Sequence, residues 1–110
     1  MQYQFGDIVL ISFPFTEDGS TKNRPALVLL DSSDKDLVVS RITSQPLKNK
    51  YDSLIENWKE AGLLLPSVVR LSKFATIGKS LVKLQLGFIT ETDLVKVKTI
   101  LNDLWCFRMK

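Results

Sequence analysis

Histidine is absent from this 110-residue chain, and cysteine occurs only once. Without histidine the protein cannot form Ser-His or Cys-His nucleophile systems, histidine acid-base pairs or the usual zinc sites. The single cysteine, Cys106, excludes an internal disulfide framework and fits a reducing compartment. Its neighbours Trp105 and Phe107 favour a packing role for the thiol. Any catalysis must therefore use other groups.

Long apolar runs are missing as well. Runs such as Ile8–Ile11 and Leu63–Leu65 are far shorter than a membrane-spanning helix, and residues 1–4 lack the basic-then-apolar pattern of a signal peptide. We therefore expect a cytoplasmic protein without a membrane partner. With 110 residues, 45% of them hydrophobic, the chain is long enough for one core and too short for two ordinary domains. The prediction is a single domain over residues 1–110.

The net charge of +3 is too small to argue for nucleic-acid binding by itself, but its distribution is uneven. Residues 1–21 carry only the acids Asp7, Glu17 and Asp18. The segment 22–50 has six cations, namely Lys22, Arg24, Lys35, Arg41, Lys48 and Lys50, against three aspartates. Glu17 and Asp18 are adjacent, point in different directions and have no partner cluster, so no metal site and no cofactor is predicted.

The first half of the chain is typical of an antiparallel meander. Three segments rich in Val, Ile and Leu, at Asp7–Phe13, Ala26–Leu30 and Leu37–Thr43, are separated by polar loops. The segment Thr16–Asn23 is too polar to be buried and is predicted to be a mobile loop.

The second half is predicted to be mixed. Helical spacing of apolar residues over Asp52–Gly62 favours a short helix that ends at Gly62. Ser67–Leu71 and Phe74–Ile77 resemble two short strands, and Leu81–Leu86 alternates like a third, with a helix as the alternative.

The C-terminal segment predicts an amphipathic helix that packs on the sheet. Thr90 and Asp93 are spaced like a capping box. An apolar stripe follows, made of Leu94, Val97, Leu101 and Leu104 and ending in Trp105.

The segment Arg24–Leu30 is the best candidate for chemistry. Pro25 fixes its own backbone and restricts the residue before it, so Arg24 is presented from a stiff backbone. In an antiparallel pair, the start of Ala26–Leu30 lies beside the end of Leu37–Thr43, which brings Arg24 close to Thr43. The plainer interpretations are a solvated surface arginine and, for Thr43-Ser44-Gln45-Pro46, ordinary turn chemistry.

Four motifs together resemble the MazF/PemK toxins of bacterial toxin–antitoxin pairs, in their PemK-like branch. In chain order they are Gly6–Val9, Asn23–Leu29, Ile42–Gln45 and the region of Trp58–Leu63 with Pro66–Arg70. The resemblance covers nearly the whole chain, and it implies an α+β, mainly β fold: an SH3-like barrel of the plasmid-maintenance-toxin type with a C-terminal helix.

The resemblance also implies a homodimer and a metal-independent endoribonuclease that cuts single-stranded RNA at short sequences. Arg24 matches the catalytic arginine of the family, Thr43 the hydroxyl residue paired with it, and Gln45 a residue near the RNA groove. The other candidate RNA contacts are Lys22, Asn23, Ser44 and Lys48. The partners implied are single-stranded RNA and an antitoxin, often acidic and partly disordered, that lies along the same groove.

Such a reaction needs neither histidine nor metal, because the 2′-hydroxyl of RNA can attack the adjacent phosphorus and leave a cyclic phosphate and a 5′-hydroxyl. A guanidinium and a hydroxyl would stabilise the charge that builds on the phosphate. Two alternatives remain open, since this fold does not by itself imply activity: a barrel that binds RNA or protein without cutting, and a gyrase-directed toxin.

Overall fold

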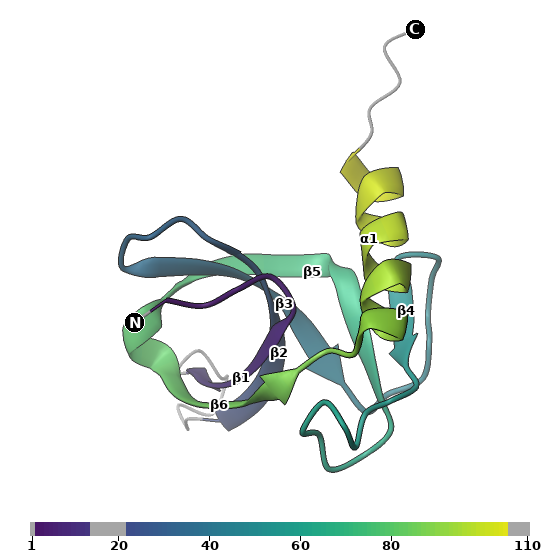
Figure 1. Cartoon of the computed structure of the whole chain (residues 1–110), viewed down its shortest axis with the longest axis horizontal. Helices are drawn as coiled ribbons and strands as arrows, with labels where there is room; N and C mark the ends of the chain where they lie inside the picture. The colour runs from purple at the N-terminus through teal and green to yellow at the C-terminus, as the bar shows by residue number, and fades with distance from the viewer. Residues whose placement is uncertain (1, 14–21, 106–110) are drawn as a thin grey trace, which may run out of the picture.

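The computed structural model describes residues 2–13 and 22–105, which form one curved antiparallel sheet and a C-terminal helix (Figure 1). The sheet has six strands in the order β4-β5-β3-β2-β1-β6. The elements are β1 Asp7–Phe13, β2 Lys22–Asp31, β3 Asp36–Thr43, β4 Asp52–Ile55, β5 Ser67–Gly78, the 3-10 turn η1 Lys79–Leu81, β6 Val82–Phe88 and α1 Glu91–Trp105. The expectation of a mainly β fold with a C-terminal helix is confirmed.

The predicted meander is confirmed, because β1, β2 and β3 are antiparallel neighbours in chain order. Side chains alternate between the two faces of each strand. On β2, Leu27 and Leu29 contact a cluster that also contains Val97 and Leu101 of α1, and we call this side the helix face. The opposite face is buried by a second cluster, made of Val9, Ile11, Ala26, Val28, Leu37, Val39 and Ile77.

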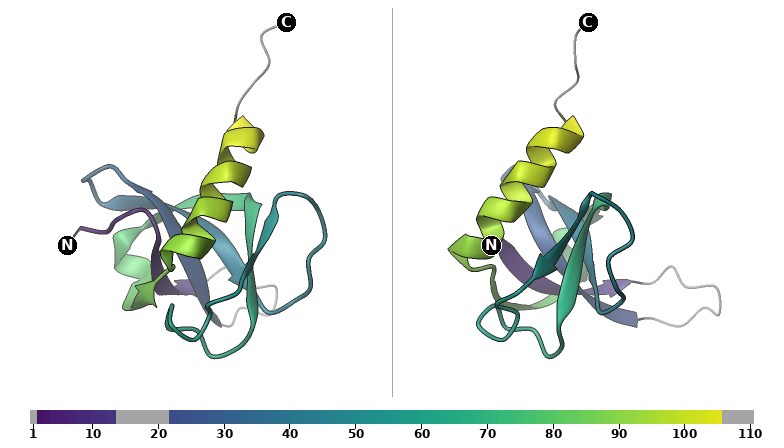
Figure 2. Two further views of the ribbon diagram at one scale, coloured as in Figure 1. Left: turned by 45° about the vertical axis from the view of Figure 1, so that its right-hand side comes forward. Right: turned by 90° about the vertical axis from the view of Figure 1, so that its right-hand side faces the viewer.

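Helix α1 follows the predicted apolar stripe. Val97 and Leu101 are buried, and Leu94 and Leu104 pack against them from half-buried positions. The helix lies beside β4 and β5 (Figure 2). Its last residue, Trp105, stacks on Phe74 of β5 with ring centroids 5.6 Å apart.

Asp93 has a different role from the predicted capping box. Its buried carboxylate accepts the backbone N–H groups of Glu56 (3.2 Å) and Asn57 (2.9 Å), in the turn that follows β4. The Thr90 hydroxyl donates a long hydrogen bond to the same carboxylate (3.4 Å) and accepts one from the Asn57 side chain (3.0 Å). Burial alone would raise the pKa of Asp93, but these N–H donors and Lys96 outweigh it and hold the pKa below its usual value.

The predicted helix over Asp52–Gly62 is wrong. Its first residues form β4, which pairs with β5 at the edge of the sheet, for example Asp52 with Arg70. The remainder is a series of turns that buries Ala61 and partly buries Trp58 in the helix-face cluster. The apolar residues are spaced as in a helix. Pairing with β5 nevertheless holds the first of them in an extended strand, because tertiary contacts outweigh local helical preference.

The two short strands predicted at Ser67–Leu71 and Phe74–Ile77 are one strand, β5. A bulge separates them, because consecutive residues Ser40 and Arg41 of β3 pair with Phe74 and Arg70. The strand predicted over Leu81–Leu86 is β6, so the helical alternative is wrong.

Some predictions fall outside the described residues. They include Glu17, Asp18, Cys106 and most of the loop Thr16–Asn23, of which only Lys22 and Asn23 are described, as the start of β2. Within the part that is described, no helix combines the length and apolar character needed to span a membrane.

Asp31, at the end of β2, ties three segments together. Its carboxylate accepts the backbone N–H of Tyr3 (2.7 Å) and of Ser33 (2.8 Å) and pairs with Lys79 of η1 (2.9 Å). These donors, the Tyr3 amide first, lower the pKa of Asp31 from 3.8 to about 2.

Replacing Asp93 with alanine should destabilise the fold, because the buried N–H groups of Glu56 and Asn57 lose their acceptor. We expect the free energy of unfolding in urea to fall by about 2–4 kcal/mol. Asp103, an exposed aspartate of the same helix, is the matched control, and Asp103→Ala should change it by less than about 0.5 kcal/mol. Equal effects of the two substitutions would contradict this role for Asp93.

Acid should remove the contribution of Asp31. Because its pKa is lowered on folding, its stabilisation is present above pH 3.8 and is lost as the pH falls through about 2. Asp31→Asn should therefore lower Tm at pH 7, and the gap between wild type and variant should narrow between pH 4 and pH 2. A gap that stays constant in thermal melts over this range would refute the linkage.

Candidate nucleic-acid interface

Arg24 lies near the start of β2, where the strand leaves its neighbour β3. The ladder between these strands begins at Ala26, one residue after Pro25, which has no N–H to donate. On its other side Arg24 is paired with Ile11 of β1. The side chain is half-buried, and its guanidinium has no hydrogen bond or ion pair with the described residues. Its donors are therefore available to a ligand.

Thr43 lies across from Arg24. The ladder between β2 and β3 ends at the pair of Ala26 with Arg41, and the same register extended by two residues would set Arg24 opposite Thr43 at the end of β3. Both residues border the same cavity. Opposed residues of an antiparallel pair project from the same face. Both side chains therefore lie on the face opposite the helix, together with Arg41, and we call this group of three the arginine face.

The Thr43 hydroxyl is held by its own turn. It accepts the backbone N–H of Gln45 at 3.2 Å, which is the turn chemistry that the residue types predict. A hydroxyl that accepts one hydrogen bond still has its proton to donate. The turn therefore orients Thr43 as a donor.

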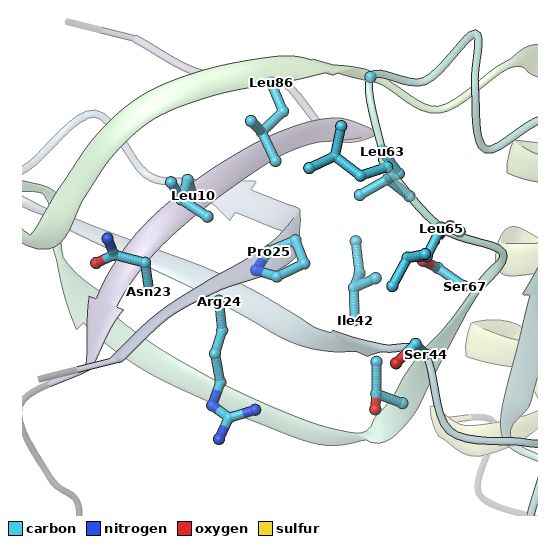
Figure 3. Close-up of a pocket in the computed structure, with 13 residues that line it drawn as sticks. Leu10, Asn23, Arg24, Pro25, Ile42, Ser44, Leu63, Leu65, Ser67 and Leu86 are labelled. Carbon is cyan, nitrogen blue, oxygen red and sulfur yellow. Dashed lines mark hydrogen bonds between the residues drawn. The ribbon is translucent and has the colours of Figure 1, made fainter.

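A cavity of about 450 Å³ lies beside these strand ends. Figure 3 shows that the Arg24 side chain points away from Pro25 and from the leucines, as strand alternation requires. The apolar lining comes mainly from Leu10, Pro25, Ile42, Leu63, Leu64, Leu65 and Leu86. Asn23, Ser44 and Ser67 add polar groups, and Arg24 and Thr43 border the cavity as well. One pair of strands thus carries an apolar hollow on one side and guanidinium groups on the other.

Two glycines allow the cavity wall to form. Gly62 has φ +93°, and a Cβ there would collide with the backbone carbonyl of Leu86. A Cβ on Gly87 would collide with the carbonyl of Ala61 in the same way. The 61–62 turn therefore packs backbone to backbone against β6. Gly62 has this role rather than the predicted one of ending a helix.

A buried ion pair holds the segment that follows Thr43. Arg70 of β5 pairs with Asp52 of β4 and also donates to the Pro46 carbonyl at 3.1 Å. The same Asp52 oxygen accepts the backbone N–H of Lys48 at 2.8 Å, and both charged side chains are less than 10% exposed. Residues 46 and 48 are thereby fixed to the sheet, a few residues from the Thr43 hydroxyl.

Comparison of the sequence with known protein families identifies the family. The sequence profile of the PemK-like, MazF-like toxins of type II toxin–antitoxin systems matches residues 4–105. The chain belongs to this toxin family.

Solved structures agree with this assignment at the level of the fold. An endoribonuclease in complex with its cognate antitoxin, from mycobacterial species, superposes with a TM-score of 0.79 at 16% identity, over 99% of this chain and 100% of that one. The Mycobacterium tuberculosis toxin MazF-mt6 superposes with a TM-score of 0.75 at 19% identity, over 93% of this chain and 98% of that one. No curated protein matches the sequence significantly.

The predicted RNA contacts divide into two groups in this toxin. Asn23 and Ser44 line the cavity. Lys22, Gln45 and Lys48 are exposed and lie outside its lining. Among the described residues, no group of three or more His, Cys, Asp or Glu side chains could hold a metal ion. The roles of Arg24, Thr43 and these five residues remain predictions.

Sequence reasoning named Arg41 only as part of the segment Arg41–Gln45, which offers further donors near Arg24, and did not list it as a site residue. A signal for its place was available, because Arg41 precedes Thr43 by two residues on a predicted strand and so shares its face. The pair of Arg70 with Asp52 was missed. No comparable signal existed for the ion pair, whose partners are 18 residues apart and meet only through β4, which was predicted as helix.

Removing Asp52 alone should leave a buried guanidinium uncompensated. We expect Asp52→Ala to lower the free energy of unfolding by about 3–5 kcal/mol. The double variant Asp52→Leu/Arg70→Met removes both charges and should lose much less, as urea unfolding can measure. A double variant no more stable than Asp52→Ala would show that burial of charge is not the cause.

Proposed function

We propose that this toxin is a metal-independent endoribonuclease that cleaves single-stranded mRNA at specific sequences in the cytoplasm. The observation that carries the proposal is the placement of Arg24 and Thr43 on one face of neighbouring strand ends, with both donors accessible. The solved relatives described above as endoribonucleases support the same class of activity.

In the proposed reaction the RNA supplies the nucleophile. The 2′-hydroxyl attacks the adjacent phosphorus, the bond to the 5′-oxygen of the next nucleotide breaks, and a 2′,3′-cyclic phosphate and a 5′-hydroxyl result. Negative charge grows on the non-bridging oxygens during attack. The paired N–H donors of Arg24 and the hydroxyl of Thr43 would stabilise that charge.

Arg24 acts in this scheme by charge rather than as a base. A guanidinium keeps its proton at physiological pH and has no acceptor site. No ion pair with a described residue neutralises it, so its charge is available to a phosphate. The Gln45 N–H that holds the Thr43 oxygen would keep the hydroxyl in place during the reaction.

Sequence preference would come from contacts to splayed bases. Asn23, Ser44 and Gln45 have polar groups that suit base edges, and Lys22 and Lys48 suit the backbone. We further propose a homodimer and an acidic antitoxin that covers the arginine face. One structural relative is a complex with its cognate antitoxin, which supports a partner of that kind.

Cleavage of single-stranded RNA in the presence of a chelator tests the proposal. We expect Thr43→Ala to lose about 10²–10³ in rate and Arg24→Ala to lose more. Thr99, whose hydroxyl bonds within α1, is a matched control, and Thr99→Ala should cleave like wild type. Mapping the ends should reveal cyclic phosphate and 5′-hydroxyl groups.

Wild-type activity no greater than that of Arg24→Ala would refute the proposal. In that case, RNA that stays bound and intact after long incubation would favour a binding module. Altered DNA supercoiling with no effect on RNA would favour a gyrase-directed toxin.

A further inference from the structure

Arg41 is the third member of the arginine face. The family match assigns it no role, and the sequence prediction names it only within a segment that offers further donors. It is paired with Ala26 of β2 and lies two residues before Thr43 on β3. Since Ala26 follows Arg24 by two residues, Arg24 and Arg41 are diagonal neighbours on adjacent strands. Diagonal neighbours have their Cβ atoms about 7–8 Å apart.

No group in the described part of the chain bonds to the Arg41 guanidinium. The residue is exposed and forms no hydrogen bond or ion pair with the described residues. Its partner on β2 is an alanine, whose methyl group offers neither a charge nor an acceptor. Two strongly basic side chains are therefore held near each other without a carboxylate between them.

The other neighbour of Arg41 is Arg70, its partner on β5. Like charges directly opposite each other disfavour a pair of strands. Here Arg70 is buried against Asp52 and the Pro46 carbonyl, so its charge is balanced and its donors are used. The ion pair thus lets a guanidinium stay at position 41 without an uncompensated charge beside it.

We propose that Arg41 binds the phosphate next to the scissile one, so that Arg24 and Arg41 hold two successive phosphates of a single RNA strand. This inference rests on the proposed function, because it takes Arg24 as the group at the scissile phosphate. A guanidinium suits the task, since its forked donors match phosphate oxygens. Such a contact sets affinity and register but reads no base.

Binding to uncleavable RNA provides the test. The probe is a random-sequence oligonucleotide in which every 2′-hydroxyl is methylated, and its affinity is measured by fluorescence anisotropy at several salt concentrations. We expect Arg41→Ala to bind about tenfold more weakly at low salt. The slope of log affinity against log salt should become shallower by about 0.7, as for one lost phosphate contact. Arg41→Lys should keep the slope of the wild type.

Lys98→Ala is the control, because Lys98 is an exposed cation of α1, the helix that packs on the other face of the sheet. It removes the same charge and should leave both affinity and slope unchanged. Wild-type affinity and slope in Arg41→Ala would overturn the inference. An equal loss in Lys98→Ala would overturn it too, since net charge alone would then explain the effect.

The cleavage assay separates this inference from the proposed function. If wild type cleaves and Arg41→Ala shows a normal KM, the inference about Arg41 fails and the proposed function stands. If wild type does not cleave, the proposed function fails, and the role assigned to Arg41 beside a scissile phosphate fails with it. The salt slope of the uncleavable probe then reports only whether Arg41 contacts a phosphate.

Discussion

The pairing register of β2 with β3 is the constraint on which the candidate site depends. Ala26 opposite Arg41 sets Arg24 opposite Thr43, and a shift by one residue would send one of these side chains to the other face. Burial protects the register, because the same shift would move Leu27 and Leu29 out of the helix-face cluster. The geometry of the charged residues is therefore stabilised by apolar residues that never contact a ligand.

The ion pair of Arg70 with Asp52 fixes the position of the loop that follows β3, as the register fixes the strands. A chain that leaves β3 at Thr43 would be free to move, but the Pro46 carbonyl and the Lys48 N–H are both bound to the pair. A buried ion pair contributes little net stability when compared with apolar residues of similar size. The ion pair also fixes the position of the loop after β3, because Arg70 and Asp52 each form a hydrogen bond with the loop backbone. Leucine side chains could not form these bonds.

Much of this arrangement could be predicted from the sequence. The apolar patterns of the three segments and of the helical stripe show which side chains are buried, and so predict three strands and a helix. Pairing the strands as an antiparallel meander then predicts that Arg24 lies close to Thr43. The segment after Asp52 could not be assigned in this way, because its apolar spacing fits a helix and pairing with β5 decides otherwise. The roles of Asp93 and Asp52 depend on partners distant in sequence, which no local pattern contains.

The division between the two faces of β2 and β3 also bears on energetics. Pro25 and Ile42 line the apolar cavity, which Arg24 and Thr43 also border, but strand alternation sends the side chains of Arg24, Arg41 and Thr43 to the opposite side. A guanidinium among the leucines would incur a large desolvation cost, and the strand period avoids this by keeping it in water until a ligand arrives. When a phosphate then displaces that water, the interaction strengthens because the local dielectric constant falls. Stiff strands packed on their apolar side can thus hold cations in fixed positions at the edge of the solvent.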